Sequence, residues 1–469
     1  MGTAAVAKLR LEVDAATEAA LDGQSRICNW LYNELLEVAG VLRARYRMDQ
    51  DTEIGRVLYT ERGLRNLLPD LKALYPFLNT VHSSPLKNAA LRASDSIRRY
   101  QDAKHGRRKG QVVGWPRFRA WRGKWFSLLF DEPAKGFKLN GNHLRLSLGK
   151  GVDGKRRSVT VTAPGARKVL ADKRVKNLRI VKQHGVFYAV FGVERPVPAQ
   201  KPVQKAIALD PNHKNLAVAV DTDGHAIEIE APWWLKRLDQ RVDELKSRRD
   251  RCKKKSVRVP ITDKDGHPTS RHYWRPSKRW RRFDAAYQRA MAKRREQTKT
   301  YLATVAQKLS RHYDLIAVGD YAPQGGGINA GMRRAMTNQS VIARFKDTLS
   351  WTALKSGKAY AEFAEAGTTR TCADCGHVVE GGLAPSVRAW ACPSCGRDHD
   401  RDENAARNGL RKLLRERQAK GGSVPSVPGS GPVPIRERWT WRVQPSGIQS
   451  RGGRTGDPIR ERQGIKRTA

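Results

Sequence analysis

Two pairs of closely spaced cysteines restrict the fold of this chain more than any other feature of its sequence. Cys372 and Cys375 form one C-x-x-C pair, Cys392 and Cys395 form another, and sixteen residues separate the pairs. Four thiolates at this spacing are typical of a tetrahedral zinc site, and a glycine follows each pair where the backbone must turn tightly. Because four thiolates leave no open position for water, the sequence predicts a structural zinc ion.

The charge of the chain indicates a polyanionic partner. Its 469 residues include 90 Lys+Arg against 46 Asp+Glu, which gives a formal net charge of +44. This surplus would repel itself unless a polyanion neutralised much of it. The charge also runs through the whole chain and is not confined to one amphipathic helix, so the sequence favours nucleic acid over a membrane surface or the ribosome.

The apolar content gives no sign of a membrane protein. No stretch approaches the ~20 apolar residues that a membrane span needs, and residues 1–20 contain no signal-peptide core. Only six cysteines occur, and four of them form the two pairs, which fits metal binding in a reducing compartment. We therefore expect a cytoplasmic protein with no membrane partner.

Changes in hydrophobic periodicity along the chain predict a multidomain α+β fold. The pattern turns from strand to helix near residue 14, to short alternating strands near 111, and to separated strands and helices after Lys205. The expected parts are a first strand (1–13), a helical domain (14–103), a β-barrel (104–203), an α/β domain (204–367 and 399–418), a zinc ribbon (368–398) and a disordered basic tail (419–469).

Three aspartates stand at the ends of predicted elements in the α/β domain. Asp210 and Asp320 each end an apolar strand, and Asp402 lies at the start of the helix that follows the ribbon. Taken alone, Asp400 or Asp402 could be an ordinary helix N-cap. Carboxylates at such positions can also converge on two divalent metal ions about 4 Å apart. The sequence therefore predicts a phosphodiester-cleaving site of Asp210, Asp320 and one acid at the helix start, Asp400 or Asp402.

Dense cations with interleaved tryptophans occupy the helices predicted at about 233–252 and 277–311. Such residues suit backbone phosphates and stacked bases, although any single one could belong to a solvated helix face. His213, His225 and His399 lie near the acids in sequence and are interpreted as surface residues. The predicted nucleic-acid-binding residues are Arg248, Arg249, Lys253, Lys254, Arg275, Lys278, Arg279 and Arg282.

The cysteine pairs, the motif D-R-D-E-N-A-A-R-N at 400–408 and the strand-end acids together resemble the RuvC-like nuclease of a known family. This is the TnpB family, the RNA-guided proteins of insertion sequences, with its relatives among compact type V CRISPR effectors. The resemblance extends from Lys8 to about Leu414. Weaker matches are S-R-I-C-N-W-L-Y-N (25–33), G-W-P-R-F-R (114–119) and T-T-R-T-C (368–372).

The resemblance implies an architecture and a set of partners. It implies a wedge-type β-barrel with an inserted helical recognition bundle, followed by an RNase-H-like RuvC domain that a nucleic-acid-binding zinc ribbon interrupts. It also implies a guide RNA with a structured scaffold and a double-stranded DNA target read beside a short flanking motif. Mg2+-dependent cleavage by a monomer or homodimer on the RNA would follow, in a prokaryotic cytoplasm near the nucleoid.

The resemblance also assigns roles to individual acids. Asp210 matches the first catalytic acid and Asp402 the third, and both would hold magnesium. Many relatives carry glutamate at the position of Gly319, so Asp320, one residue later, is the candidate for the second acid. A side chain displaced by one residue points to the other face of an ideal strand unless the backbone bulges.

Other functions remain open at this point. An RNA-guided protein that binds DNA without cleaving it would share the fold, and Gly319 with the short acid after it motivates that alternative. A DNA transposase or its accessory protein is a second alternative. A ribosomal or purely structural zinc-ribbon protein would also be basic, but it would not need acids at the ends of buried strands.

Overall fold

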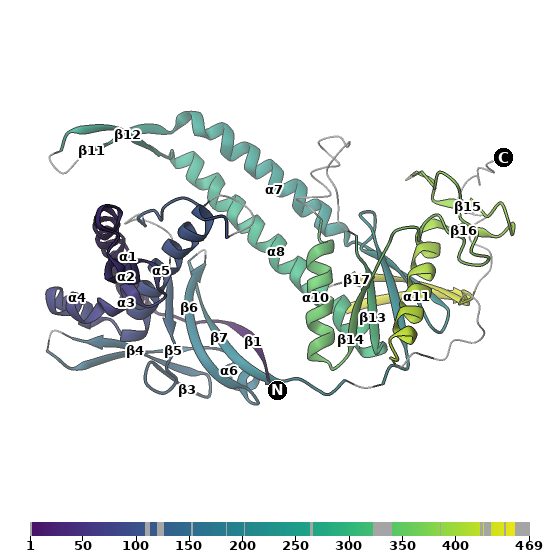
Figure 1. The fold of residues 1–469 in the computed structure, drawn as a ribbon, viewed down its shortest axis with the longest axis horizontal. Helices are drawn as coiled ribbons and strands as arrows, with labels where there is room; N and C mark the ends of the chain where they lie inside the picture. The colour runs from purple at the N-terminus through teal and green to yellow at the C-terminus, as the bar shows by residue number, and fades with distance from the viewer. Residues whose placement is uncertain are drawn as a thin grey trace. The chain divides into compact units, whose positions relative to one another are not determined.

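This computed structural model divides the chain into two units, Met1–Pro196 and Val197–Ala469 (Figure 1). The second unit begins slightly before residue 204, where the sequence predicted the α/β domain to start. The residues that the structure describes are 2–107, 113–119, 126–151, 153–183, 185–200, 202–262, 266–321, 340–384, 386–422, 425, 433–444 and 447–454.

A group of helices follows the first strand of the first unit. The longest of them, α1, begins where the side chain of Asp14 accepts a hydrogen bond from the backbone N–H of Thr17, and one of its faces buries leucines in the core of the unit. None of the described helices of the chain is both long and apolar enough to cross a membrane. These elements are β1 (Gly2–Arg10), α1 (Ala15–Asp49), α2 (Thr52–Tyr59), α3 (Gly63–Asn66), α4 (Leu68–Leu74), η1 (Pro76–Thr80) and α5 (Ser83–Lys104).

Two open sheets form the rest of the first unit, and no closed barrel is present among its described residues. The strand orders are β1-β7-β6-β2 and β3-β4-β5. The sheets meet at one isolated bridge between Glu12 and Thr162 and share a hydrophobic core. Sequence alternation identifies strands but not whether their edges pair, so the predicted closure was wrong. The elements are β2 (Ser127–Phe130), β3 (Phe137–Asn140), β4 (His143–Lys150), β5 (Arg156–Thr162), α6 (Ala166–Leu170), β6 (Arg174–Gln183) and β7 (Val186–Pro196).

Two of the weaker sequence motifs contact each other in the first unit. The backbone N–H of Arg119 donates to Asn33 Oδ1 at 2.7 Å, and Asn33 Nδ2 donates to the carbonyl of Arg119 at 2.9 Å. The Arg119 guanidinium also lies over the ring of Tyr32, 3.5 Å from its centroid. These motifs therefore fasten the segment at 114–119 to helix α1.

One mixed sheet with the order β14-β13-β8-β9-β10-β17-β18 is the centre of the second unit. Strand β13 lies between β8 and β14 and is parallel to both, whereas β9 and β10 continue the sheet as antiparallel neighbours. The strands are β8 (Ala206–Pro211), β9 (Ala217–Asp221), β10 (His225–Ile229), β13 (Leu315–Gly319), β14 (Ala359–Phe363), β17 (Glu437–Gln444) and β18 (Gly447–Arg454).

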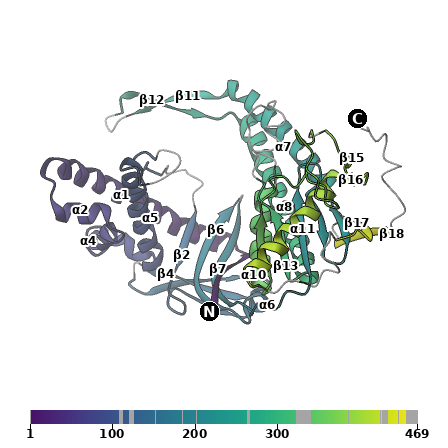
Figure 2. The same cartoon turned by 45° about the vertical axis from the view of Figure 1, so that its right-hand side comes forward.

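Helices cover both faces of this sheet (Figures 1 and 2). Along β8, Ile207 and Leu209 pack in the core beneath α8 (Lys278–His312) and α10 (Ile342–Lys355). The alternate residues of β8, with Phe363 of β14, pack against α11 (Arg401–Ala419) on the other face. Gly409 of α11 brings that helix close, because a Cβ there would lie 2.3 Å from the Phe363 ring.

Helices α7 (Trp233–Arg251) and α8 form a long antiparallel pair that extends away from the sheet of their unit (Figure 1). The buried side chain of Arg294 on α8 pairs with Asp239 on α7 and holds the two helices together. A hairpin of β11 (Val257–Thr262) and β12 (Pro268–Arg275), preceded by the short helix η2 (Cys252–Lys255), connects their far ends.

The tail predicted to be disordered contains two strands instead. Strand β17 is parallel to β10, and β18 pairs with β17, so the tail extends the central sheet. Trp441 is buried, and Trp439 and Val443 at alternate positions pack against the same core. This alternation was hidden by the surrounding Gly, Ser and Arg. The rest of the tail, 423–424, 426–432, 445–446 and 455–469, lies outside the described residues.

Candidate metal centres and nucleic-acid interface

The four predicted zinc-binding cysteines lie together, with all their sulfur atoms within 4.8 Å of one another. The Sγ atoms of Cys372 and Cys395 are 3.8 Å apart, and those of Cys375 and Cys392 are 3.6 Å apart. Sulfur atoms about 2.3 Å from a tetrahedral zinc ion would be about 3.8 Å apart, so the four thiols fit zinc.

Each cysteine pair forms a tight backbone turn that points its sulfur atoms inward. The N–H of Gly376 donates to the carbonyl of Cys372, and that of Gly396 donates to the carbonyl of Cys392. Both glycines have positive φ, 80° and 70°. This conformation costs little without a Cβ, which explains the residue that follows each pair.

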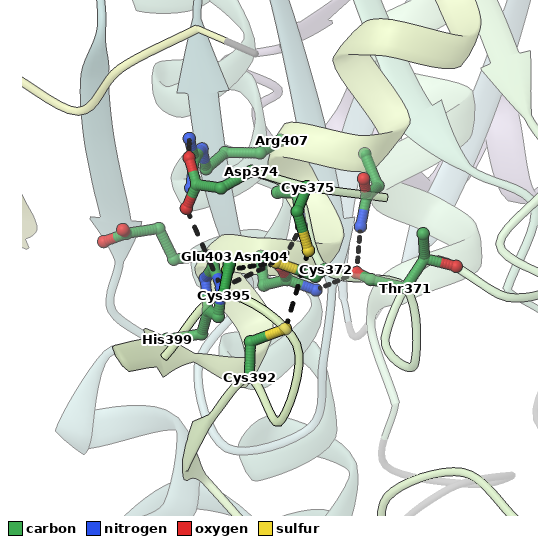
Figure 3. A network of polar contacts seen from close by, with 12 residues as sticks. Thr371, Cys372, Asp374, Cys375, Cys392, Cys395, His399, Glu403, Asn404 and Arg407 are labelled. Carbon is green, nitrogen blue, oxygen red and sulfur yellow. Dashed lines mark hydrogen bonds and ion pairs between the residues drawn. The ribbon is translucent and has the colours of Figure 1, made fainter. Parts of the chain in front are cut away.

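Helix α11 is attached to the ribbon through the asparagines of the D-R-D-E-N-A-A-R-N motif (Figure 3). Asn404 Nδ2 donates to the carbonyls of Thr368 and Thr371, and Asn404 Oδ1 accepts from the N–H of Ala373 at 2.8 Å. Asn408, one turn later, donates to the same two carbonyls at 2.9 and 2.7 Å. The two asparagines thereby fix the start of α11 against the polypeptide that enters the first cysteine pair.

A buried ion pair adds a second link between helix and ribbon (Figure 3). Arg407, 9% exposed, makes two parallel hydrogen bonds of 2.7 and 3.1 Å to Asp374, which lies inside the first cysteine pair. His399, which the sequence predicted to be on the surface, is buried, and its Nε2 is 3.1 Å from the Sγ of Cys372. The prediction was wrong because the ring of Trp390 covers that of His399.

Two of the three predicted catalytic acids lie on the same face of the sheet. Asp210 continues the alternation that places Ala206 and Ala208 of β8 beneath α11, and Asp402 lies in the first turn of that helix. Asp400 is the N-cap, because its carboxylate accepts the N–H groups of Asp402 and Glu403. The Asp402 carboxylate is therefore not needed to cap the helix. It lies close enough to Asp210 for its charge to raise the pKa of Asp210.

Asp320 is differently placed. It follows β13 directly and is exposed, whereas Gly319 before it is buried on the side of α11. Its carboxylate accepts a hydrogen bond from the backbone N–H of Glu365 at 3.0 Å, and its own N–H donates to the carbonyl of Phe363. The strand continues straight through Gly319 without a bulge, so the Asp320 side chain starts on the face away from Asp210.

Glu365, a residue that the sequence reasoning missed, lies over Gly319. A Cβ at residue 319 would be only 2.0 Å from Glu365 Oε1. The Glu365 carboxylate also influences the ionisation of Asp210. The sequence carried one sign of this position: Glu365 continues the alternation of Ala359, Ala361 and Phe363, which face α11.

Burial and mutual repulsion alter the ionisation of these acids. Burial, followed by the charges of Glu365 and Asp402, raises the pKa of Asp210 well above its ordinary value. Burial, followed by the charge of Asp320, raises the pKa of Glu365 to about 7. Burial also raises the pKa of Asp402, although Arg388 of the ribbon forms an ion pair with it at 3.0 Å. Raised pKa values of this kind are common among acids at functional sites.

The predicted nucleic-acid-binding residues cluster where α7 and α8 meet the β11–β12 hairpin, here called the basic arm (248–262 and 266–282). Arg249 is held in the structure by Asp250 and Asp284 and stacks over Tyr287. Tyr273 and Trp274 of β12 are each 51% exposed beside these cations. The remaining predicted residues are exposed and form no ion pair with a described residue: Arg248, Lys253, Lys254, Arg275, Lys278, Arg279 and Arg282.

Comparison with known proteins supports the resemblance. Residues 343–409, from α10 through the ribbon into α11, match the family model described as Cas12f1-like, TNB domain. The "CRISPR-associated DNA-binding protein Cas12m" of Allomeiothermus silvanus is 32% identical over 154 residues, which make up 31% of this chain and 26% of the relative. The matched region thus spans about a quarter of that relative's length.

A solved structure shares the fold of most of the chain. It is the Cas12f1 protein in a cryo-EM complex of Cas12f1, sgRNA and target DNA, with a TM-score of 0.53 and 10% identity, and the match covers 86% of this chain and 98% of that one. The multidomain α+β fold is therefore that of compact Cas12 effectors. The domain match and the related sequence likewise make this chain similar to compact type V CRISPR effectors.

Proposed function

We propose that this protein is an RNA-guided DNA endonuclease with a Mg2+-dependent RuvC-like site. The observation that carries the proposal is the pair of acids, Asp210 and Asp402, which approach each other from a strand end and a helix start. Asp210 is 8% exposed, and its carboxylate has no hydrogen bond or ion pair with a described residue. A buried carboxylate without a cation is costly, and a bound metal would remove that cost.

The acids fit a divalent metal by their chemistry. Carboxylate oxygens are the ligands that Mg2+ prefers, and Asp210 and Asp402 would hold it. When bound, paired magnesium ions would activate water and stabilise the leaving 3'-oxygen of a phosphodiester. The protein would hold Asp210 on a buried strand and Asp402 on a helix attached to the ribbon, so that the two carboxylates stay close to each other.

We further propose that the partners are a guide RNA with a structured scaffold and a double-stranded DNA target. Pairing with the guide would select the target, while the protein contacts phosphates and the shape of the heteroduplex. The net charge of +44 and the exposed cations of the basic arm support this assignment. The four-thiol ribbon would hold zinc as a structural ion that positions α11.

Substitution of Asp210 by alanine tests the nuclease proposal. We expect cleavage of a guide-matched DNA in Mg2+ to fall by at least about 100-fold, because the variant loses a metal ligand. Binding to the same DNA should remain within about twofold, since recognition relies on guide pairing and phosphate contacts. Cleavage would be measured on labelled plasmid and binding by gel shift in EDTA. Full cleavage by Asp210→Ala would refute the assignment of the site.

An RNA-guided protein that binds DNA without cleaving it is the second candidate. The ion pair of Arg388 with Asp402 favours it, because a cation already occupies part of the place that a metal would need. The name of the Allomeiothermus relative, a DNA-binding protein, points the same way. The wild-type protein separates the two functions: stable guided binding with no metal-dependent product would establish the second.

Neutralising cations in the basic arm tests its contact with nucleic acid. The variant Lys253→Ala/Lys254→Ala should weaken guide RNA or target binding at all sequences, and the slope of log K against log salt should become shallower by about 1.5. The matched control is Arg56→Ala/Arg157→Ala, which removes two cations already paired with Glu53 and Asp153. Titration by fluorescence anisotropy at four salt concentrations would measure both slopes. Equal slopes in the two variants would exclude the arm from the interface.

A further inference from the structure

We infer that Glu365 is a metal-binding acid of the nuclease site. It would take the role of the glutamate that many relatives carry at the position of Gly319. The inference rests on the proposed metal-dependent function. It moves the second acid of that site from the end of β13 to the segment after β14. In this chain the second acid would come from the segment after β14 and reach across β13. Asp320 would then be a positioning residue, and the metal would be held by Asp210, Glu365 and Asp402.

The strand register places Glu365 within reach of the site. Val318 of β13 pairs with Leu209 of β8, so Gly319 and Asp210 follow at the same level on neighbouring parallel strands. On the other side of β13, Gly319 pairs with Phe363 of β14, and Glu365 lies two residues further on. Because successive side chains alternate between faces, Asp210, Gly319 and Glu365 all fall on the face that α11 covers.

The side chain of Glu365 occupies the space that a side chain at residue 319 would fill. A Cβ built on Gly319 would lie 2.0 Å from Glu365 Oε1 and 2.6 Å from both Cδ and Cγ. Real Cβ atoms do not approach other atoms so closely. A side chain at residue 319 and the observed position of the Glu365 side chain therefore exclude each other.

Two carboxylates of the site have oxygens without partners among the described residues, which fits a cation-binding role. Glu365 Oε1 is buried and has no hydrogen-bond partner among the described residues. Asp210, more than nine-tenths buried, faces the same region without a partner.

The backbone around Glu365 is fixed by contacts of its own N–H and carbonyl, while the backbone N–H of Tyr321 reaches one side of its carboxylate and Oε1 keeps no partner among the described residues. Asp320 Oδ1 accepts the N–H of Glu365 at 3.0 Å, and Thr368 donates both its N–H and its hydroxyl to the carbonyl of Glu365. Thr368 in turn provides one of the carbonyls to which Asn404 and Asn408 donate. Glu365 is thus tied to the same segment that positions α11 and Asp402.

Metal binding, measured separately from cleavage, tests the inference. The isosteric variant Glu365→Gln should bind Mn2+ at least about 10-fold more weakly than wild type in the full-length protein with its guide RNA, measured by electron paramagnetic resonance. The matched control is Glu362→Gln, three residues earlier, whose carboxylate pairs with Lys346 instead. The control should bind Mn2+ as wild type does. If Glu365 only fills space, Glu365→Gln will also bind normally, and the inference fails.

The variant Asp210→Asn distinguishes failure of the inference from failure of the proposed function. Loss of Mn2+ binding in Asp210→Asn with normal binding in Glu365→Gln would retain the metal site and remove Glu365 from it. Normal binding in both variants would overturn the metal-dependent function itself. Loss in both variants, with the control unaffected, supports the inference.

Moving the carboxylate back to β13 provides a second test. Gly319→Glu alone should weaken Mn2+ binding, because it forces the Glu365 side chain out of its observed position, and Glu365→Gly alone should weaken it through the missing acid. The double variant Gly319→Glu/Glu365→Gly should bind Mn2+ more tightly than either single variant. A double variant no better than Glu365→Gly alone would show that the two positions do not serve one site.

Discussion

The variant Cys392→Ser should lose its zinc ion and at least about 99% of its nuclease activity. Three thiolates hold zinc far more weakly than four, and zinc binding supplies about 10 to 16 kcal/mol of folding free energy in comparable small zinc modules. Hydrophobic packing of the ribbon is slight, since its described core consists of Cys372, Trp390 and Cys392 with three partly buried apolar residues. Without zinc, the segment that holds α11 should therefore unfold.

The loss should reach the acids through helix α11. Asn404 and Asn408 both donate to the carbonyls of Thr368 and Thr371, which directly precede the first cysteine pair. When that segment unfolds, the first turn of α11 and Asp402 lose their position relative to Asp210. Zinc would be measured by plasma mass spectrometry and activity by cleavage of a guide-matched plasmid.

A cysteine outside the ribbon provides the control for this prediction. Cys252 lies in the short helix η2, away from the sulfur cluster, so Cys252→Ser should keep one zinc ion per chain. Full activity of Cys392→Ser after complete loss of zinc would contradict the positional role of the ribbon.

The sequence predicted those parts of the site whose chemistry depends on local spacing. The C-x-x-C pairs are separated by a fixed number of residues, and their geometry follows from that separation alone. Asp210 and Asp402 were also predictable, because an apolar strand that ends in an acid and an acid in the first turn of a helix are local patterns. Their convergence required only that β8 and α11 pack together, which the alanines of α11 allow.

Glu365 was not predictable in the same way, because its position depends on which strands are neighbours. The run A-E-F-A-E-A at 361–366 contains two glutamates, and alternation places Glu362, which pairs with Lys346, and Glu365 on opposite faces without telling which face holds the other acids. The position of Glu365 near Asp210 becomes evident only from the pairing of β14 with β13, because the absence of a side chain at Gly319 leaves space for the Glu365 carboxylate. Similarly, the pairing of β17 with β10 joins residues more than 200 positions apart, and composition alone suggested disorder there.

Substitution of Arg407 by alanine should destabilise the attachment of α11 to the ribbon by about 3 to 5 kcal/mol. Burial raises the pKa of Asp374, but the hydrogen bonds and charge of Arg407 outweigh it and hold that pKa below its ordinary value. Arg407→Ala would leave Asp374 charged, largely buried and without its main partner. Zinc release to a colorimetric chelator, followed against urea concentration, would report the loss of stability in the ribbon itself.

A double-mutant cycle separates the interaction free energy of the Arg407–Asp374 pair from the free-energy cost of burying one charge without its partner. Asp374→Ala should also destabilise, because Arg407 would keep only its 3.1 Å hydrogen bond to the carbonyl of Val433. The double variant should cost less than the sum of the single variants, since neither charge is then buried without its partner. Additive effects would mean that the two side chains act independently. Coupling would establish that Arg407 of the D-R-D-E-N-A-A-R-N motif stabilises the ribbon through Asp374.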